Sequence, residues 1–478
     1  MRNNRLFFKN LPFLVLSILT LLSSCKKLDE APKSFVTPDK FYTTQGQVEA
    51  AFAASMNYLW NYWEGYGYGQ GVFINDDQMD GGDLVITRNH GSDLWNRHFA
   101  AISNMNSAIS AMKKGSLGSG TSQANYDLLM AQAKFLRAYN YFMLVRMFGG
   151  LPLLTEDTQD AITAKIGRSS IADVYKLIVS DFTEAAAKLP AKWPTAQQGR
   201  PTNGAAKALL AKAYLTMATA PLNDVTNYKK AADLAKEIIA AGNYKLVTDV
   251  TKVFTTETKY GPEMMWSYNS NYADINTDPE IYRPGLLNGW GDIRVQLEWE
   301  QQYPKDARKD AYILTEIDGK HYTQWPDEQN PFVKKFMYDK QEDFDNYSSI
   351  MNMPIIRYAD VLLIYAEAAN MANGSPTADA VDAINPVIDR ANAYTNNPLH
   401  PKLTTAMTKD AFDAAVIQER NKELCFEYDR WFDLIRKRIL KESSIPSIQQ
   451  NFSDADYLFP IPDNDVQLNS LITQNPGY

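Results

Sequence analysis

The chain has 478 residues, with 48 Lys and Arg against 56 Asp and Glu, so its formal net charge is −8. An acidic balance of this kind argues against a protein that binds nucleic acid through the phosphates. Hydrophobic residues make up 45% and charged residues 22% of the chain, which excludes disorder, collagen and coiled coil. The two cysteines, Cys25 and Cys425, are too few for a disulfide framework and too far apart for a zinc site.

The first residues carry the features of an export signal. They begin with three basic side chains, Arg2, Arg5 and Lys9. An apolar run over 11–22 follows, and it is shorter than the about 20 residues that a membrane-spanning helix needs. The run closes on Leu22-Ser23-Ser24-Cys25, which resembles a bacterial lipobox. We therefore expect a signal peptide over 1–24, a lipid on Cys25 and a tether over 25–40; a cleaved signal with an incidental cysteine is the alternative.

Helical periodicity fills two long parts of the remaining chain. Apolar residues recur every three or four positions in seven segments, over 48–63, 95–112, 129–147, 171–189, 205–217, 228–239 and 358–371. Two of the segments end at Gly242 and Gly374, and alanine at inward positions lets helix axes approach closely. We therefore predict a mainly all-α protein of tetratricopeptide-like helical hairpins, over about 45–241 and 356–440.

The connecting segments give further expectations. Ser375-Pro376 is suited to open a helix over 378–391, and Pro386 should interrupt that helix because proline removes a hydrogen-bond donor. Three long stretches are rich in Gly, Pro, Asn and Asp, at about 60–93, 242–355 and 441–478. They are also rich in aromatic residues, which disordered segments lack, so we expect irregular parts that pack on the helices and carry the binding surface.

Several strings resemble the SusD/RagB family of outer-membrane nutrient-binding lipoproteins, and they occur in the order that the family has. They are Thr37-Pro38-Asp39-Lys40-Phe41-Tyr42, Phe135-Leu136-Arg137-Ala138-Tyr139, Gly149-Gly150-Leu151-Pro152-Leu153, Pro201-Thr202-Asn203-Gly204, Ile356-Arg357-Tyr358-Ala359-Asp360, Arg430-Trp431-Phe432-Asp433-Leu434 and Gln474-Asn475-Pro476-Gly477-Tyr478. The resemblance covers nearly the whole chain. It implies a helical half with a loop-rich, irregular half laid over it, so we expect residues 41–478 to form a single SusD-like domain.

The resemblance also implies a role. Such a protein is lipid-anchored and surface-exposed on the cell outer membrane, where it binds an oligo- or polysaccharide and hands it to a SusC-type TonB-dependent transporter. The same role with peptide cargo is the alternative, because the family binds either class. A surface glycoside hydrolase and a helical adaptor for proteins are less favoured: the chain lacks G-x-S-x-G, H-E-x-x-H and a P-loop. We expect no catalytic activity, no cofactor and no nucleic-acid partner.

Charged residues inside the family strings are expected to be structural rather than catalytic. They are Arg357, Asp360, Glu367, Arg420, Glu423, Glu427, Arg430, Asp433 and Arg436. Glu423 and Glu427 are four positions apart, and Arg430 and Asp433 three, spacings at which side chains meet along a helix. Because buried charges need partners, we expect these residues to orient the helices.

Candidate ligand contacts lie in the first two loop-rich stretches. The first group is Trp60, Trp63, Tyr66 and Tyr68, whose rings could stack on the flat face of a sugar. A facing wall is expected from Tyr282, Arg283, Asn288, Trp290 and Trp325; core packing is the alternative for these rings. Asp76 and Asp77 could accept hydrogen bonds from hydroxyl groups or cap a turn. A calcium loop starting at Asp76 fails because its twelfth position is Thr87, so no metal is expected.

Overall fold

The helices of the protein form hairpins that follow one another along the chain. In the computed structural model the long helices are α3 (Gln45–Trp60), α5 (Ser92–Lys113), α6 (Gln123–Phe148), α8 (Ile171–Lys188), α9 (Asn203–Met217), α10 (Asn227–Ala241), α14 (Tyr358–Asn373), α15 (Ala378–Ala391) and α16 (Lys409–Glu423). Shorter ones are α11 (Leu297–Gln302), α12 (Ala307–Tyr312), α17 (Arg430–Lys437) and α19 (Asp463–Leu468). The structure describes residues 41–60, 78–79, 91–118, 120–158, 165–270, 281–291, 293–326, 329–337, 350–393, 399–442 and 452–478.

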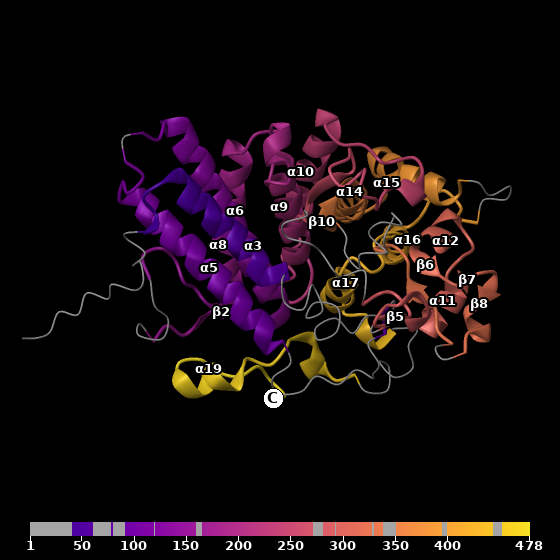
Figure 1. The fold of residues 1–478 in the computed structure, drawn as a ribbon. Helices are drawn as coiled ribbons and strands as arrows, with labels where there is room; N and C mark the ends of the chain where they lie inside the picture. Colours follow the sequence, from indigo (N-terminus) through magenta and orange to yellow (C-terminus); the bar gives the residue numbers. More distant parts are fainter. Residues whose placement is uncertain are drawn as a thin grey trace, which may run out of the picture. The chain divides into compact units, whose positions relative to one another are not determined.

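Each long helix packs against the next one in the chain, as expected of stacked hairpins. From α3 to α10 every consecutive pair is in contact, and Figure 1 shows these helices side by side. The row continues across an interval of more than 100 residues, because α10 packs against α14, which in turn contacts α15 and α16. The helical part of the chain is therefore one stack built from two separate stretches of sequence.

Alanine and local caps explain why these helices lie close together and begin where they do. In α9 the buried faces are largely alanine, and α9 contacts α8 and α10 along its length. The hydroxyl groups of Ser170 and Thr202 accept hydrogen bonds from backbone amides in the first turns of α8 and α9. The expected helix ends at Gly242 and Gly374 are confirmed, because both adopt the left-handed conformation directly after α10 and α14.

Two expectations about α15 need correction. The helix is capped by Thr377, whose hydroxyl oxygen accepts a hydrogen bond from the amide of Ala380, and not by Ser375-Pro376. Pro386 does not interrupt the helix, which runs through it from Ala378 to Ala391. Proline removes one hydrogen bond, and the buried side chains on both sides of it hold the remaining turns in place.

The stretch over 242–355, expected to be irregular, contains short strands. The strands of the chain are β1 (Gln78–Met79), β2 (Leu151–Pro152), β3 (Arg168–Ser169), β4 (Met264–Tyr268), β5 (Arg294–Val295), β6 (Ile313–Leu314), β7 (Glu316–Ile317), β8 (Lys320–His321), β9 (Phe332–Val333) and β10 (Met353–Arg357). Four of them form an antiparallel sheet in the order β1-β5-β9-β6, and β4 pairs with β10. This stretch is therefore ordered by short ladders rather than by long elements.

Residues 42–478 form one compact unit. Its hydrophobic core runs through the whole helical stack, and a second small cluster forms around Leu314, Tyr322, Trp325 and Phe332 beside the four-stranded sheet. Among the described helices, none combines the length and the apolar character that crossing a membrane requires.

Candidate functional site

Two loop-rich stretches meet at the four-stranded sheet. Strand β1 comes from the first stretch and pairs with β5 of the second, with Gln78 opposite Val295 and Met79 opposite Arg294. The backbone of Gln78 and Met79 thereby lies beside β5, directly after the segment that leads into that strand.

The segment leading into β5 is a hairpin over residues 281–293, called here the Trp290 hairpin. The amide of Ile293 donates to the carbonyl oxygen of Ile281 at 2.9 Å, and the amide of Gly291 donates to that of Arg283 at 2.9 Å. Gly289 lies so close to the opposite arm that a Cβ atom there would be 2.0 Å from the carbonyl oxygen of Arg283. Only glycine fits at this position, so the tip has a defined course.

The tip of the Trp290 hairpin presents an aromatic ring and an amide to solvent. Trp290 is 50% exposed, and the side chain of Asn288 is exposed beside it. Leu286, 43% exposed, belongs to the same tip. A stiff indole next to an amide is the combination that stacks on a sugar ring and hydrogen-bonds its hydroxyl groups. Of the expected facing wall, the structure thus places Asn288 and Trp290 at the exposed tip of one hairpin.

Tyr282, Arg283 and Trp325 are placed differently, in the interior. Tyr282 and Arg283 are 0% exposed and Trp325 only 2%. The hydroxyl group of Tyr282 meets that of Tyr428, and its ring packs on Phe336. These three side chains are therefore too deeply buried to contact a ligand at the surface. Tyr282 and Arg283 support the hairpin from beneath. Trp325 packs in the small second cluster.

The remaining candidate contacts lie outside the described residues. They are Trp63, Tyr66, Tyr68, Asp76 and Asp77; Trp60 closes α3, and only its backbone is described. The proposed lipidation site Cys25 is also outside the described residues.

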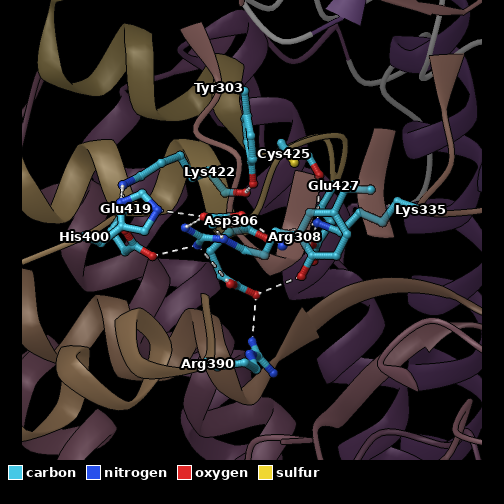
Figure 2. Close-up of polar contacts among 12 residues, drawn as sticks. Tyr303, Asp306, Arg308, Lys335, Arg390, His400, Glu419, Lys422, Cys425 and Glu427 are labelled. Atoms are coloured by element: carbon cyan, nitrogen blue, oxygen red, sulfur yellow. Dashed lines mark hydrogen bonds and ion pairs between the residues drawn. The ribbon is translucent and has the colours of Figure 1, made fainter. Parts of the chain in front are cut away.

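A large group of charges in the described chain is mostly buried and contains as many cations as carboxylates. Figure 2 shows its centre, where Arg308 lies between Asp306 and Glu419 at 2.7 and 2.6 Å. The cations of the group are Arg308, Lys335, Arg357, Arg390 and Lys422, and the carboxylates are Glu263, Asp306, Glu419, Glu423 and Glu427. This set is called the buried ionic cluster. It joins residues on α12, β10, α15 and α16, so it holds the helical stack to the stretch with the short strands.

Glu423 is the most heavily paired carboxylate of the buried ionic cluster. Its Oε1 atom lies 2.7 Å from Nη2 of Arg390 and 2.9 Å from Nη1 of Arg357. Burial by itself raises the pKa of Glu423, but these two guanidinium groups outweigh burial and hold that pKa well below its usual value. The pKa of Glu427 is lowered for the same reason, by Arg357 and Lys335 against the effect of burial.

These electrostatics do not suit acid catalysis. A catalytic acid needs a raised pKa so that it carries a proton near neutral pH, whereas Glu419, Glu423 and Glu427 have lowered pKa values. All three are also nearly inaccessible, with side chains at most 8% exposed. The structural role expected for the charged family strings is what this geometry supports.

Two pairings within those strings differ from the expectation. Glu423 ends α16 and Glu427 lies in the turn beyond it, so the two meet through Arg357 and not along one helix face. Asp433 bonds Arg420 at 2.8 Å and Arg436 at 2.7 Å. Asp433 therefore pairs with the arginine three positions after it, Arg436, and not with Arg430 three positions before it, as was expected.

Several residues in the buried ionic cluster, or in contact with it, had no signal in the sequence. Asp306 and Arg308 come from a loop-rich stretch, and His400 reaches Asp306 with its Nε2 atom at 2.7 Å. Arg390 sits on the buried face of α15, where an apolar residue is the usual occupant. Their partners are distant in sequence, so spacing along the chain could not reveal them.

Comparison with known proteins places this architecture in a family. A model of the SusD family matches residues 327–478, and a model described as starch-binding associating with outer membrane matches residues 31–215. The SusD-like protein P2 of Formosa agariphila is 27% identical over 523 residues, covering 98% of this chain and 99% of that protein. The starch-binding protein SusD of Bacteroides thetaiotaomicron is 22% identical over 423 residues, covering 73% of this chain and 72% of that protein.

Solved structures share the fold. The crystal structure of a SusD homolog from Bacteroides thetaiotaomicron matches with a TM-score of 0.79 at 22% identity, covering 92% of this chain and 98% of that chain. This match confirms the mainly all-α, SusD-like fold expected from the sequence. Together, the two family models, which match residues 31–215 and 327–478, and the full-length relative show that the chain belongs to the SusD/RagB family.

Proposed function

We propose that the protein is a lipid-anchored glycan-binding protein of the outer-membrane surface, which hands its ligand to a SusC-type TonB-dependent transporter. The observation that carries the binding proposal is the half-exposed ring of Trp290 on a hairpin whose base is buried. The family relationship supports it, since one relative is named a starch-binding protein and one matching model describes starch binding at the outer membrane.

The Trp290 hairpin has the physical properties of a sugar platform. Its arms are joined by backbone hydrogen bonds and Gly289 fixes the close approach at the tip, so little conformational entropy is lost when a ligand binds. The exposed indole offers an apolar face that pyranose C–H groups can cover. No bond-breaking step is proposed, because the paired carboxylates of the buried ionic cluster are inaccessible.

The proposed anchor rests on the sequence before the described residues. A lipid on Cys25 would hold the body to the membrane by acyl chains. Metabolic labelling of cells with a fatty-acid analogue tests this: label on the wild type and none on Cys25→Ser supports the anchor, and equal labelling contradicts it.

Isothermal titration across a panel of soluble polysaccharides and peptides tests the binding proposal. Wild type should bind at least one glycan without releasing reducing ends, and Trp290→Ala should weaken that binding by about 1–3 kcal/mol, the value for other aromatic stacking platforms. Leu468→Ala is the matched control, since it removes an exposed apolar side chain, 73% exposed, outside the hairpin. Binding to peptides alone, release of reducing ends or unchanged affinity in Trp290→Ala would each contradict the proposal.

The transporter partner needs its own measurement. A tagged protein isolated from native membranes in mild detergent should carry a SusC-type transporter, identified by mass spectrometry. Isolation of the protein without any such transporter would contradict this part of the proposal.

A further inference from the structure

A cavity of about 500 Å³ lies in the helical stack, where α14 packs against both α10 and α15 (Figure 1). Its volume is within the range of about 300–1,000 Å³ that is usual for small-ligand sites, and such sites often lie between packed helices. No residue of the Trp290 hairpin lines it. We call it the Tyr358 pocket, after the tyrosine that begins α14 and belongs to its lining.

Tyrosine rings and aliphatic side chains form much of the lining of the Tyr358 pocket. Tyr358, Leu362 and Tyr365 follow one another at four and three positions, so they share one face of α14. Ile239 lines the pocket from α10, and Pro386 lines it from α15. Tyr365 is 6% exposed, whereas Tyr358 is only partly buried. These groups supply an apolar surface that the C–H groups of a pyranose ring can cover.

An ion pair joins two of the helices that line the pocket. The Nζ atom of Lys236 in α10 lies 2.6 Å from Oδ2 of Asp379 in α15, and both residues belong to the lining. The hydroxyl group of Tyr365 donates to the same oxygen at 3.4 Å. These groups therefore satisfy one another and hold the helices around the pocket.

Three other polar groups of the lining have no partner among the described residues. They are the hydroxyl group of Tyr358, the ammonium group of Lys245 and the carboxylate of Asp382. The first can donate or accept a hydrogen bond, the second donates and the third accepts, which matches the hydroxyl groups of a sugar. With Lys236 and Asp379 included, the lining has two cations and two carboxylates, so its charge favours a neutral ligand.

Pro386 adds one more acceptor to the lining. Proline has no N–H group, so it cannot donate to the carbonyl oxygen of Asp382, four positions earlier in α15. Both residues line the pocket. This carbonyl oxygen therefore lacks its usual helical partner and is available beside the carboxylate of the same residue. The proline inside α15 thus creates a polar group where a ligand would lie.

We infer that the Tyr358 pocket is a second sugar site, which takes an uncharged pyranose ring. The phenol rings and Pro386 cover the apolar face of the sugar, and Tyr358, Lys245 and Asp382 exchange hydrogen bonds with its hydroxyl groups. The ligand class rests on the proposed glycan-binding function, whereas the position of the site does not depend on the Trp290 hairpin.

Titration calorimetry on the full-chain variant Trp290→Ala tests the inference with the indole of the hairpin removed. The probes are four neutral trisaccharides: maltotriose, cellotriose, mannotriose and xylotriose. At least one should bind this variant, and added salt should leave its affinity unchanged because an uncharged sugar forms no charge pair that salt can screen. Trigalacturonate is the charged counterpart and should not bind more tightly than the best neutral probe.

Substitutions added to Trp290→Ala locate the binding. Tyr358→Ala should weaken the neutral probe about fivefold or more, as expected for loss of a stacked ring. Pro386→Ala supplies the N–H group that the carbonyl oxygen of Asp382 lacks, and it should weaken binding about twofold to tenfold, the range for one hydrogen bond. Because alanine suits a helix better than proline, a merely structural role of Pro386 predicts no such loss. Tyr260→Ala is the matched control, since Tyr260 is 39% exposed and does not line the pocket.

The outcomes separate this inference from the proposed function. Absent binding of all four neutral probes to Trp290→Ala, tighter binding of trigalacturonate, or unchanged affinity after both Tyr358→Ala and Pro386→Ala would overturn the inference; if Tyr358→Ala does not fold, Pro386→Ala decides. If Trp290→Ala then still weakens a glycan relative to wild type, the function of the hairpin stands alone. If instead the pocket variants weaken a neutral sugar and Trp290→Ala weakens none, the pocket is supported and the hairpin proposal fails.

Discussion

Replacing Glu423 by glutamine tests whether the buried ionic cluster holds the fold together. The change keeps the shape of the side chain and removes its charge. Glu423 is 0% exposed, and its carboxylate contacts Arg390 at 2.7 Å, Arg357 at 2.9 Å and Arg308 at 3.2 Å. The cations of the cluster would then share four carboxylates instead of five, and burial would leave the excess positive charge weakly screened.

The expected cost follows from that burial. Removing one partner of a buried ion pair typically costs about 3–5 kcal/mol, because the remaining charge stays buried without compensation. Domain stabilities are commonly about 5–15 kcal/mol, so this loss is a large share of the total. An exposed pair behaves differently. Asp233 and Lys229 form an i,i+4 pair in α10 with both side chains more than half exposed, so Asp233→Asn should change little.

Urea unfolding followed by circular dichroism measures both variants. Glu423→Gln should lower the free energy of unfolding by about 3 kcal/mol or more, while Asp233→Asn should match the wild type. If Glu423→Gln did not fold at all, that result would also agree with a large loss of stability. A folded Glu423→Gln variant with wild-type stability would refute the reasoning that these charges hold the helices to the loop-rich stretch.

Two further predictions concern acid stability and the hairpin. Burial raises the pKa of Glu367, but Arg436 outweighs it and lowers the pKa from 4.5 to about 2, a shift worth about 3 kcal/mol. That stability is fully present above about pH 4.5 and is lost as the pH falls toward 2. The free energy of unfolding should therefore change more between about pH 6 and pH 3 in wild type than in Glu367→Gln. An equal change in both proteins would contradict this role of Glu367. Gly289→Ala should weaken glycan binding about as much as Trp290→Ala, because the new Cβ atom would collide with the carbonyl oxygen of Arg283 and move the tip. Wild-type affinity of Gly289→Ala in calorimetry would contradict this prediction.

The helical stack could be predicted from the sequence because its signals are local. Apolar spacing marked α5, α6 and α8, and Gly242 and Gly374 marked two helix ends. The tolerance of α15 for Pro386 was not predictable, since it depends on tertiary packing that outweighs one lost hydrogen bond. The two-residue strands of the four-stranded sheet were missed because strands so short leave no alternation in the sequence.

The candidate site was only partly predictable for the same reason. Composition marked 242–355 as aromatic-rich, but it could not tell the exposed ring of Trp290 from the buried ring of Trp325. That difference depends on which side of the chain faces the second hydrophobic cluster, a property of the folded state.

A crystal structure of the protein with an oligosaccharide chosen from the titration panel would show whether the Trp290 hairpin binds glycan. We expect a sugar ring stacked on the indole of Trp290, with the oligosaccharide intact. A cleaved oligosaccharide, or an intact one bound elsewhere while the Trp290 hairpin stays empty, would contradict it.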